Sequence, residues 1–348
     1  MIKNDFYSKE SLGAAYRFSL GDFQLSRGGS IKDAQLSYSL HGELNAEANN
    51  AILFPVMFSG THSSLKHYIA AGLALDPERY CIIVPDQLGN GVSSSPHNTP
   101  SLNAMSDFPA LDIADDVEAQ YQLCQSLGIT ELALVTGWSM GAQQTLEWAV
   151  THPSMVKRAA PIAGTAQCTA HDGLFIDVFT QALRSDPQWN KGNYLASSDV
   201  NEGLNRLATI FAMMGLSTQF YKQETWRNLD FGSLEEFISN FWQAWFAPMD
   251  ANALLAMADK WKQGDCSRPY QNNLNTALKR ITAKTSYIAF SEDMFIPVQD
   301  CLFEQKLIND SELFVIDSLW GHFAMMGLDK SDFSEINTIL SNLLESPC

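Results

Sequence analysis

The sequence predicts an α/β protein with a mostly parallel, doubly wound sheet and an inserted helical segment. Short continuous apolar runs recur along the chain, as is typical of strands that are covered on both faces. Amphipathic stretches with helical spacing lie between these runs, and such alternation of strands and helices predicts a doubly wound core. From residue 168 to residue 280 the strand pattern disappears, and aromatic-rich helical patterns replace it.

The length and composition favour one large domain with an insertion. At 348 residues and 46% hydrophobic residues, the chain is long enough to bury a full core. We divide it into a first core part (1–167), a helical cap or lid (168–280) and a second core part (281–348).

The first part of the chain predicts an antiparallel hairpin at the edge of the sheet. Residues 22–26 and 35–40 alternate in polarity on either side of Arg27, Gly28 and Gly29. The clearest helix is predicted at 113–127, where apolar residues recur at three- and four-residue steps and Gly128 supplies a stop. The predicted buried strands are residues 51–58, 80–84, 132–136, 159–163, 285–290 and 312–316.

The middle segment is predicted to be helical and rich in aromatic contacts. Phe, Trp and Met recur at helical spacing in residues 237–246 and 254–261. Aromatic side chains at this spacing usually pack inward, so most of them should form the core of the cap. We expect a minority to line an apolar substrate channel.

A sharp strand-to-helix turn is predicted at residues 137–141, which read Gly-Trp-Ser-Met-Gly. The glycines suit such a turn because it leaves no room for Cβ atoms beside the neighbouring strand and helix. The turn would present the hydroxyl of Ser139 at the carboxyl edge of the sheet. It would also place the backbone N–H of Met140 at a helix start, where it can stabilise a developing oxyanion.

The five-residue pattern is weak alone, because a chain of this composition can show it by chance, but its context strengthens it. Asp293 follows the predicted strand 285–290, and His322 follows the predicted strand 312–316. The order serine, aspartate, histidine, with the acid and the base each after a strand, is the order that an α/β-hydrolase fold requires. The predicted fold is therefore an α/β-hydrolase fold with a helical cap.

These three residue types form a known unit for nucleophilic catalysis. A neutral imidazole can take the proton of a serine hydroxyl near pH 7, and His322 is the candidate base. Asp293 can then accept the Nδ1–H and stabilise the imidazolium. Glu292 and Asp300 are rival acids, although the strand-end position favours Asp293. The alternative is that Asp293 only caps a helix and His322 is a surface residue.

A second oxyanion donor should come from the loop at residues 54–60. We choose the backbone N–H of Phe58. The alternative is that this loop merely turns.

Charge and targeting signals exclude several classes of partner. The chain has 39 acidic and 22 basic residues, and its formal net charge of −17 should repel nucleic acid and anionic membranes. No apolar stretch approaches the roughly 18 residues of a membrane span, and the N-terminus lacks a secretory pattern. We therefore expect a soluble, cytoplasmic protein with a small-molecule substrate. The sequence leaves open whether it forms a homodimer.

Cysteine and histidine spacing gives no support for a metal or disulfide framework. The six cysteines are scattered without C-x-x-C spacing, which favours reduced thiols. His62 and His67 alone make a weak case for a metal site. We expect neither a metal nor a cofactor.

Several stretches are similar to motifs of one known family. They are residues 38–45, 50–53, 58–60, 86–89, 139–141, 146–149, 152–153, 186–189, 192–194, 250–252, 293–297 and 321–322. On these residues the chain resembles the homoserine O-acetyltransferase branch of the α/β-hydrolase superfamily, from about residue 38 to residue 324. The resemblance implies the same three catalytic residues, Ser139, Asp293 and His322.

The chain departs from this family where the family recognises its substrate. Thr180 stands where the family has an arginine that meets the amino-acid carboxylate, and a neutral hydroxyl cannot replace a bidentate guanidinium. Ala114 and Asp115 stand at an arginine–aspartate pair, Leu254 replaces a tyrosine, and Phe323 replaces an acidic residue. We therefore predict that homoserine is not the acceptor.

Three functions remain as hypotheses. The leading one is a serine hydrolase that cleaves a small or medium acyl ester or thioester through an acyl-Ser139 intermediate. The second is an O-acyltransferase that uses acetyl-CoA as co-substrate and an alcohol other than homoserine as acceptor. The third is a ligand-binding receptor on a hydrolase scaffold. Haloalkane dehalogenation is excluded because it needs a carboxylate where Ser139 stands.

Overall fold

The computed structural model describes residues 2–347, and in this part of the chain an eight-stranded sheet has the order β1-β2-β4-β3-β5-β6-β7-β8. The β1/β2 and β2/β4 pairs are antiparallel, and the remaining neighbours are parallel. The predicted sheet, with an antiparallel hairpin at its edge, is confirmed. The strands are β1 (Tyr16–Gln24), β2 (Ser30–His41), β3 (Ala51–Leu53), β4 (Cys81–Pro85), β5 (Leu132–Trp138), β6 (Arg158–Ile162), β7 (Lys284–Phe290) and β8 (Ser311–Ile316).

One predicted strand is wrong in its second half. The strand expected at residues 51–58 ends at Leu53. The N–H of Phe54 still donates to the carbonyl of Ile83 (2.8 Å), but Pro55 has no N–H with which to continue the ladder. The chain therefore leaves the sheet here and forms the loop that contains Phe58.

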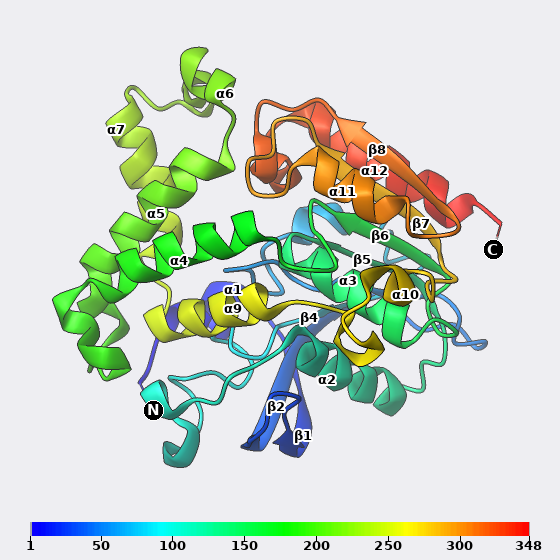
Figure 1. Cartoon of the computed structure of the whole chain (residues 1–348), viewed down its shortest axis with the longest axis horizontal. Coiled ribbons are helices and arrows are strands. Elements are labelled where there is room, and N and C mark those ends of the chain that lie inside the picture. The colour runs from blue at the N-terminus through cyan, green and yellow to red at the C-terminus, as the bar shows by residue number, and fades with distance from the viewer. Residues whose placement is uncertain (1, 348) are drawn as a thin grey trace.

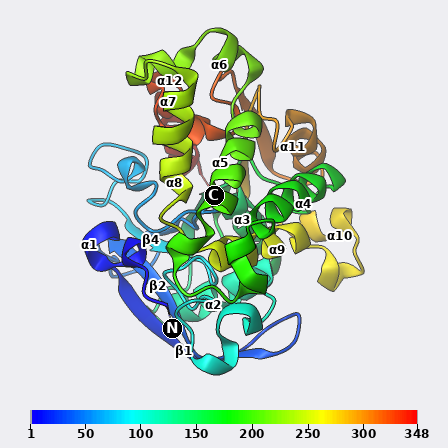
Figure 2. The same cartoon turned by 90° about the vertical axis from the view of Figure 1, so that its left-hand side faces the viewer.

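Helices cover both faces of the sheet (Figure 1). Helices α2 (Ile113–Ser126), α3 (Met140–Thr151) and α11 (Val298–Gln305) lie on one face, and α12 (Lys330–Glu345) lies on the other, as the turned view of Figure 2 also shows. The short helix α1 (Lys9–Leu12) lies near the N-terminus. This arrangement is the doubly wound architecture that the alternating pattern predicts.

Helix α2 confirms the helix predicted at 113–127. Its first turn is closed by a capping box, in which the side chain of Asp112 accepts backbone N–H groups and the carboxylate of Asp115 accepts the N–H of Asp112 (2.8 Å). After the helix ends, Gly128 adopts a left-handed conformation with φ of 73°.

The segment 168–280, called the cap below, consists of helices and the loops that join them. Helices α4 to α9 lie together beside the sheet, whereas α10 lies next to α3 (Figure 1). The cap helices are α4 (Ala170–Arg184), α5 (Asn201–Gly215), α6 (Thr218–Lys222), α7 (Leu234–Phe237), the π-helix η8 (Ile238–Gln243), α8 (Ala244–Phe246), α9 (Ala251–Gln263) and α10 (Leu274–Leu278).

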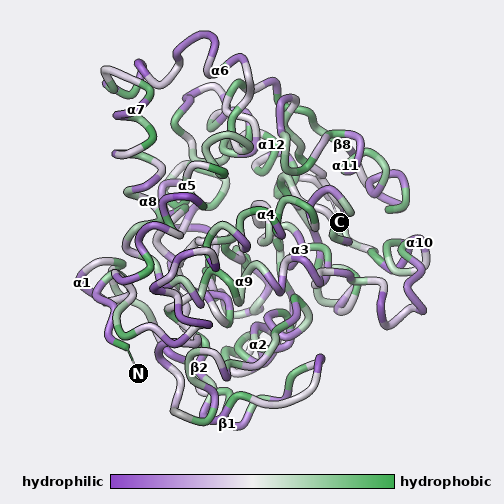
Figure 3. Tube along the Cα trace, turned by 60° about the vertical axis from the view of Figure 1, so that its left-hand side comes forward, coloured by the Kyte–Doolittle hydropathy of each residue, from purple (hydrophilic) through white to green (hydrophobic). Residues whose placement is uncertain are grey.

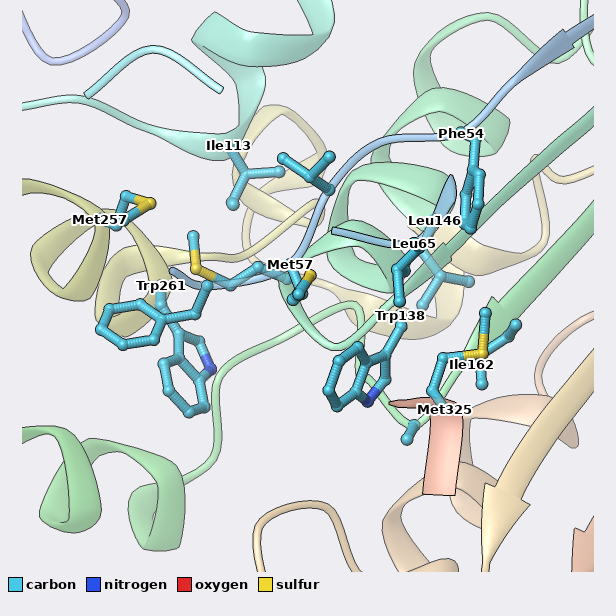
Figure 4. Close-up of a cluster of buried hydrophobic side chains, with 14 of the residues drawn as sticks. Phe54, Met57, Leu65, Ile113, Trp138, Leu146, Ile162, Met257, Trp261 and Met325 are labelled. Carbon is cyan, nitrogen blue, oxygen red and sulfur yellow. The ribbon is translucent and has the colours of Figure 1, made fainter. Parts of the chain in front are cut away.

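The apolar core continues from the sheet into the cap. Figure 3 shows many hydrophilic residues in the segments around α6 and α10, but Phe220 of α6 and Leu278 of α10 are fully buried in the apolar core. Figure 4 shows Met57 between Trp138 of β5 and Trp261 of α9. All three residues border one cavity at the carboxyl edge of the strands, where the functional site is expected.

Candidate active site

The turn that carries Ser139 is as tight as the two glycines predict. Ser139 has φ of 58° and ψ of −118° between β5 and α3. A Cβ atom on Gly137 would lie 2.5 Å from the carbonyl carbon and oxygen of Gly141, and one on Gly141 would lie 2.4 Å from the carbonyl oxygen of Pro55. Neither position can hold a larger residue without moving the backbone, so the glycines allow this strained serine conformation.

The structure brings the three predicted side chains into one hydrogen-bonded chain. The Nε2 atom of His322 lies 2.9 Å from the Oγ of Ser139, and its Nδ1 lies 2.7 Å from the Oδ2 of Asp293. The three residues are at most 6% exposed. The arrangement allows the imidazole to accept the serine proton while the aspartate fixes the ring and its tautomer.

Backbone groups fix the second oxygen of the aspartate. The Oδ1 of Asp293 accepts the N–H groups of Phe295 (2.8 Å) and Ile296 (2.9 Å), which lie in the turn after β7. Of the rival acids, Glu292 is exposed and Asp300 is half-buried on α11. The acid that contacts His322 is therefore Asp293, as the strand-end position predicts.

The two candidate oxyanion donors lie on either side of the serine. Met140 directly follows Ser139 as the first residue of α3, and Phe58 lines the same cavity as Ser139. Within residues 2–347, the N–H groups of Phe58 and Met140 donate to no other protein group. Both are therefore available to a ligand, and their role in binding an oxyanion stays a prediction.

A small cavity with a mostly apolar lining adjoins the serine. Apart from His322, none of the described residues that line it has an acidic or basic side chain. The ring of Phe295 lies 4.6 Å and that of Trp138 lies 5.4 Å from the imidazole of His322. The full lining consists of Met57, Phe58, Ser59, Trp138, Ser139, Phe211, Trp245, Trp261, Phe295, His322 and Phe323.

Three cap aromatics contribute to this lining, and sequence spacing could not distinguish them from the aromatics inside the cap. Phe211, Trp245 and Trp261 border the cavity, whereas Phe237 is fully buried among other cap residues. The indole N–H of Trp245 donates to the Oγ of Ser59 (3.1 Å). This pair also borders a second, outer hollow, so it separates the catalytic cavity from that hollow.

The other titratable residues do not join the site. Among the described residues, no group of three or more His, Cys, Asp and Glu side chains is arranged to hold a metal ion. His62 instead bonds through Nδ1 to Asp86 (2.7 Å). The five cysteines within residues 2–347 are free thiols, as expected, and Cys348 lies outside the described residues. No helix in that range is both long and apolar enough to cross a membrane.

The residues at the positions that depart from the resembled family carry no positive charge. The hydroxyl of Thr180 donates to the carbonyl of Asp177 (3.3 Å) within α4. Asp115 accepts the N–H of Ser26 (2.7 Å), and Leu254 is buried in α9. Phe323 lines the cavity, so an aromatic ring lies where the family has an acid.

Comparisons with known proteins agree with this fold. Residues 52–327 match the family described as alpha/beta hydrolase fold. The chain is 44% identical to the ethyl acetate hydrolase of Pseudomonas veronii, over 99% of this chain and 99% of that protein. The structure of an acetylester hydrolase from Corynebacterium glutamicum is 45% identical, with a TM-score of 0.98 over 99% of this chain and 100% of that chain.

More distant similarity extends to acyltransferases. A homoserine O-acetyltransferase of Zymomonas mobilis is 31% identical over 80% of this chain and 83% of that protein. The sequence motifs and these relatives indicate the same family. The hydrogen-bonded residues Ser139, His322 and Asp293 are the three that the resemblance to this family implies. The chain belongs to the alpha/beta hydrolase fold family, in the branch that also includes homoserine O-acetyltransferases.

Proposed function

We propose that the protein is a serine esterase that hydrolyses short-chain esters through an acyl-Ser139 intermediate. The observation that carries this proposal is the unbroken hydrogen-bonded chain from Ser139 through His322 to Asp293 at the wall of an apolar cavity. A serine at a tight elbow beside a neutral imidazole is a nucleophile ready for acyl transfer.

In the first half of the reaction, the Oγ of Ser139 attacks the ester carbonyl carbon while His322 takes the hydroxyl proton at Nε2. The carbonyl oxygen becomes an oxyanion, which the N–H groups of Phe58 and Met140 stabilise. The bond to the alkoxy oxygen then breaks, and His322 donates its proton to the departing alcohol. Asp293 stabilises the positive imidazolium throughout this step.

In the second half, water resolves the acyl-enzyme. His322, now neutral, accepts a proton from a water molecule that attacks the acyl carbon, and the same two N–H groups bind the second oxyanion. The bond to the Oγ of Ser139 breaks, the serine recovers its proton from His322, and the carboxylic acid leaves. No metal or cofactor takes part in this cycle.

The size and polarity of the cavity favour small, apolar substrates. The free space beside Ser139 is small and its lining is mostly aromatic, so a short acyl group with a short alcohol fits it better than a bulky ester does. The relatives named ethyl acetate hydrolase and acetylester hydrolase support acetate esters of short alcohols as the first substrates to test. The free thiols of the described cysteines support the cytoplasm as the compartment of the protein.

Acyl transfer to an alcohol is the second candidate, because an acyltransferase is 31% identical to this chain. In that reaction acetyl-CoA would acylate Ser139, and an alcohol would replace water in the second half. Homoserine remains a poor acceptor in our proposal, since the described residues that line the cavity include no arginine or lysine to bind its carboxylate.

The proposal is tested with purified protein, ethyl acetate and a fluorophosphonate. Wild type should hydrolyse the ester, and Ser139→Ala should lower kcat by at least about 10⁴-fold because the nucleophile is lost. The fluorophosphonate should label Ser139 in the wild type and in Ser59→Ala, whose removed hydroxyl lines the same cavity. Unchanged turnover in Ser139→Ala would refute the proposal. Faster acetyl-CoA consumption on addition of an alcohol would instead favour the transferase.

A further inference from the structure

The segment after β4 is bonded to the loop that carries Phe58. The carboxylate of Asp86 accepts the backbone N–H (2.9 Å) and the Nδ1 (2.7 Å) of His62. The amide of Asn90 donates to the carbonyl of Gly60 (3.1 Å) and to Asp86 (3.0 Å). All these groups are buried, so their hydrogen bonds are shielded from water. Together these bonds fix the end of the loop.

Gln87 holds the start of the same loop, together with a longer bond from the amide of Gln144 to the carbonyl of Val56 (3.3 Å). The Nε2 of Gln87 donates to the carbonyl oxygens of Val56 (2.6 Å) and Met57 (3.0 Å), and the residue is fully buried. A rotated amide would place the Oε1 of Gln87 against two carbonyl oxygens. The orientation with the amide nitrogen toward the loop is therefore the one that chemistry allows.

This contact, together with the N–H of Gly60 that donates to the carbonyl of Met57 (3.0 Å), sets the direction of the next N–H. The peptide unit between Met57 and Phe58 is trans and planar, so its C=O and N–H point in opposite directions. Because the carbonyl of Met57 is directed toward Gln87, the N–H of Phe58 is directed away from Gln87. Phe58 lines the cavity together with Ser139, and its N–H has no protein acceptor within the described residues.

The other end of the Gln87 amide does not contribute to stability. Its Oε1 is buried and has no hydrogen-bond partner within residues 2–347. A buried acceptor without a donor is destabilising, and native structures hold few of them.

We propose that Gln87 is a positioning residue for the oxyanion site. It holds the Met57–Phe58 peptide so that the N–H of Phe58 is directed toward the position where the oxyanion forms. Gln87 does not touch the substrate and acts only through this peptide. The inference rests on the proposed esterase function, because it assigns a role in stabilising the acyl-transfer oxyanion.

The test compares Gln87→Leu and Gln87→Glu with the control Gln143→Leu. Leucine removes the donor. A glutamate, ionised or protonated, cannot donate to both carbonyls, so at least one of them keeps only its other donor, the amide of Gln144 for Val56 or the N–H of Gly60 for Met57. Gln143 is a second buried glutamine, on α3, and its amide atoms have no partner in the described residues, so its replacement removes no hydrogen bond from the loop.

The readouts separate positioning from a general loss of structure. Both Gln87 variants should lower kcat for ethyl acetate by about 10- to 100-fold, with KM within about threefold, because a misdirected donor loses part of what one oxyanion donor supplies. A trifluoromethyl ketone mimics the oxyanion, and its affinity for both variants should fall by the same factor as their kcat/KM. Gln143→Leu should leave both quantities within about twofold. Circular dichroism should show that all three variants are folded.

Two results would overturn the inference. If Gln87→Glu and Gln87→Leu keep the kcat of the wild type, the glutamine does not position the donor, while wild-type turnover keeps the proposed function intact. If kcat/KM falls without any loss of affinity for the trifluoromethyl ketone, the effect lies outside the oxyanion site. Absence of ester hydrolysis by the wild type would instead refute the proposed function itself.

Discussion

Two of the contacts that join the cap to the core differ in character, one being charged and one aromatic. In the charged contact, Lys260 of α9 forms an ion pair with Asp116 of α2, and both side chains are fully buried. The same ammonium donates to the carbonyl of Leu88 (2.9 Å). Nearby, Arg268 pairs with Asp112 at the start of α2. This contact therefore depends on specific charged partners.

The aromatic contact lies on the other side of the cap. Trp242 of η8 meets Phe323 edge to face with ring centroids 4.7 Å apart, and Phe220 of α6 meets Trp320 at 4.9 Å. Trp245, three residues after Trp242, borders the catalytic cavity. This side of the cap is held by ring packing rather than by ion pairs.

The difference between the charged and the aromatic contact suggests that one affects stability and the other affects substrate selectivity. A buried ion pair is strongly destabilising when one partner is removed, because the remaining charge is left without water or a counter-charge. Ring packing is less dependent on one partner and tolerates changes of shape better. No residue of the charged contact lines the catalytic cavity, whereas Phe323 and Trp245 of the aromatic contact do. The charged contact should therefore govern stability, and the aromatic contact should govern which substrates fit.

The largest effect is expected from Lys260→Ala. Removal of the ammonium leaves Asp116 buried and unpaired, and we expect the free energy of unfolding to fall by about 3–5 kcal/mol. Lys262→Ala is the matched control, because Lys262 lies on the same helix but its 2.5 Å pair with Asp177 is 36% and 46% exposed. The control should change stability by less than about 1 kcal/mol. Urea denaturation measures the free energy of unfolding of both variants.

A double variant sharpens this test. In Lys260→Met with Asp116→Leu both charges are replaced by apolar groups, so stability should return to near that of the wild type. If Lys260→Ala and Lys262→Ala lose the same free energy of unfolding, the buried ion pair contributes no more to stability than the exposed one. The distinction between the two cap contacts would then fail on its charged side.

The second prediction concerns Glu147 of α3, which lies beside the charged contact. The pKa of Glu147 is raised to about 7, mainly by burial and also by the negative charges of Asp112 and Asp265, while the positive charge of Arg268 acts in the opposite direction. In the unfolded chain a glutamate titrates near a pKa of about 4.3. Between these pH values the folded protein keeps a proton that the unfolded chain releases.

The sign of the pH effect follows from this difference. The contribution of Glu147 to stability is fully present below about pH 4.3 and is lost as the pH rises through about 7. Glu147→Gln has no such titration, so its stability relative to the wild type should rise by about 3 kcal/mol between pH 4.5 and pH 8. Urea denaturation at several pH values measures this difference. A difference that stays constant with pH would contradict the predicted shift.

The charged contact also shows where prediction from the sequence ends. The periodicity of α2, its N-terminal cap and the glycine after it can be seen in the residues themselves. The pairing of Lys260 with Asp116 cannot, because it joins residues 144 positions apart and depends on how the cap is placed on the core. The sequence marks both residues only as ordinary charged residues on amphipathic helices.

The candidate site could be predicted further than the cap contacts because its signals are local. Ser139 lies in a glycine motif, and Asp293 and His322 follow strands, so the fold itself brings them to one edge of the sheet. Trp245 has no such signal, since aromatic residues at helical spacing look alike whether they face a core or a cavity. Gln87 lies in the stretch 86–89 that resembles the family, but this resemblance gives no role to its side chain, and its contact with Val56 and Met57 depends on the fold.

The last prediction tests the aromatic side through Trp245→Ala. The indole closes the catalytic cavity by its hydrogen bond to Ser59 (3.1 Å) and separates it from the outer hollow. Its removal should join the two spaces, so kcat/KM for hexyl acetate relative to ethyl acetate should rise by about tenfold. Because Trp245 is already half-buried at a cavity wall, stability should fall by less than in Lys260→Ala.

The matched control is Trp189→Ala, which removes another half-buried cap tryptophan whose indole N–H also has one side-chain acceptor, Asn252 (3.0 Å). Trp189 does not line the catalytic cavity, so this variant should keep the preference of the wild type for ethyl acetate. An equal change of preference in both variants would mean that the cap acts as a whole. A change in Trp245→Ala alone, without a large loss of stability, would locate substrate selection at the aromatic contact and leave stability to the charged one.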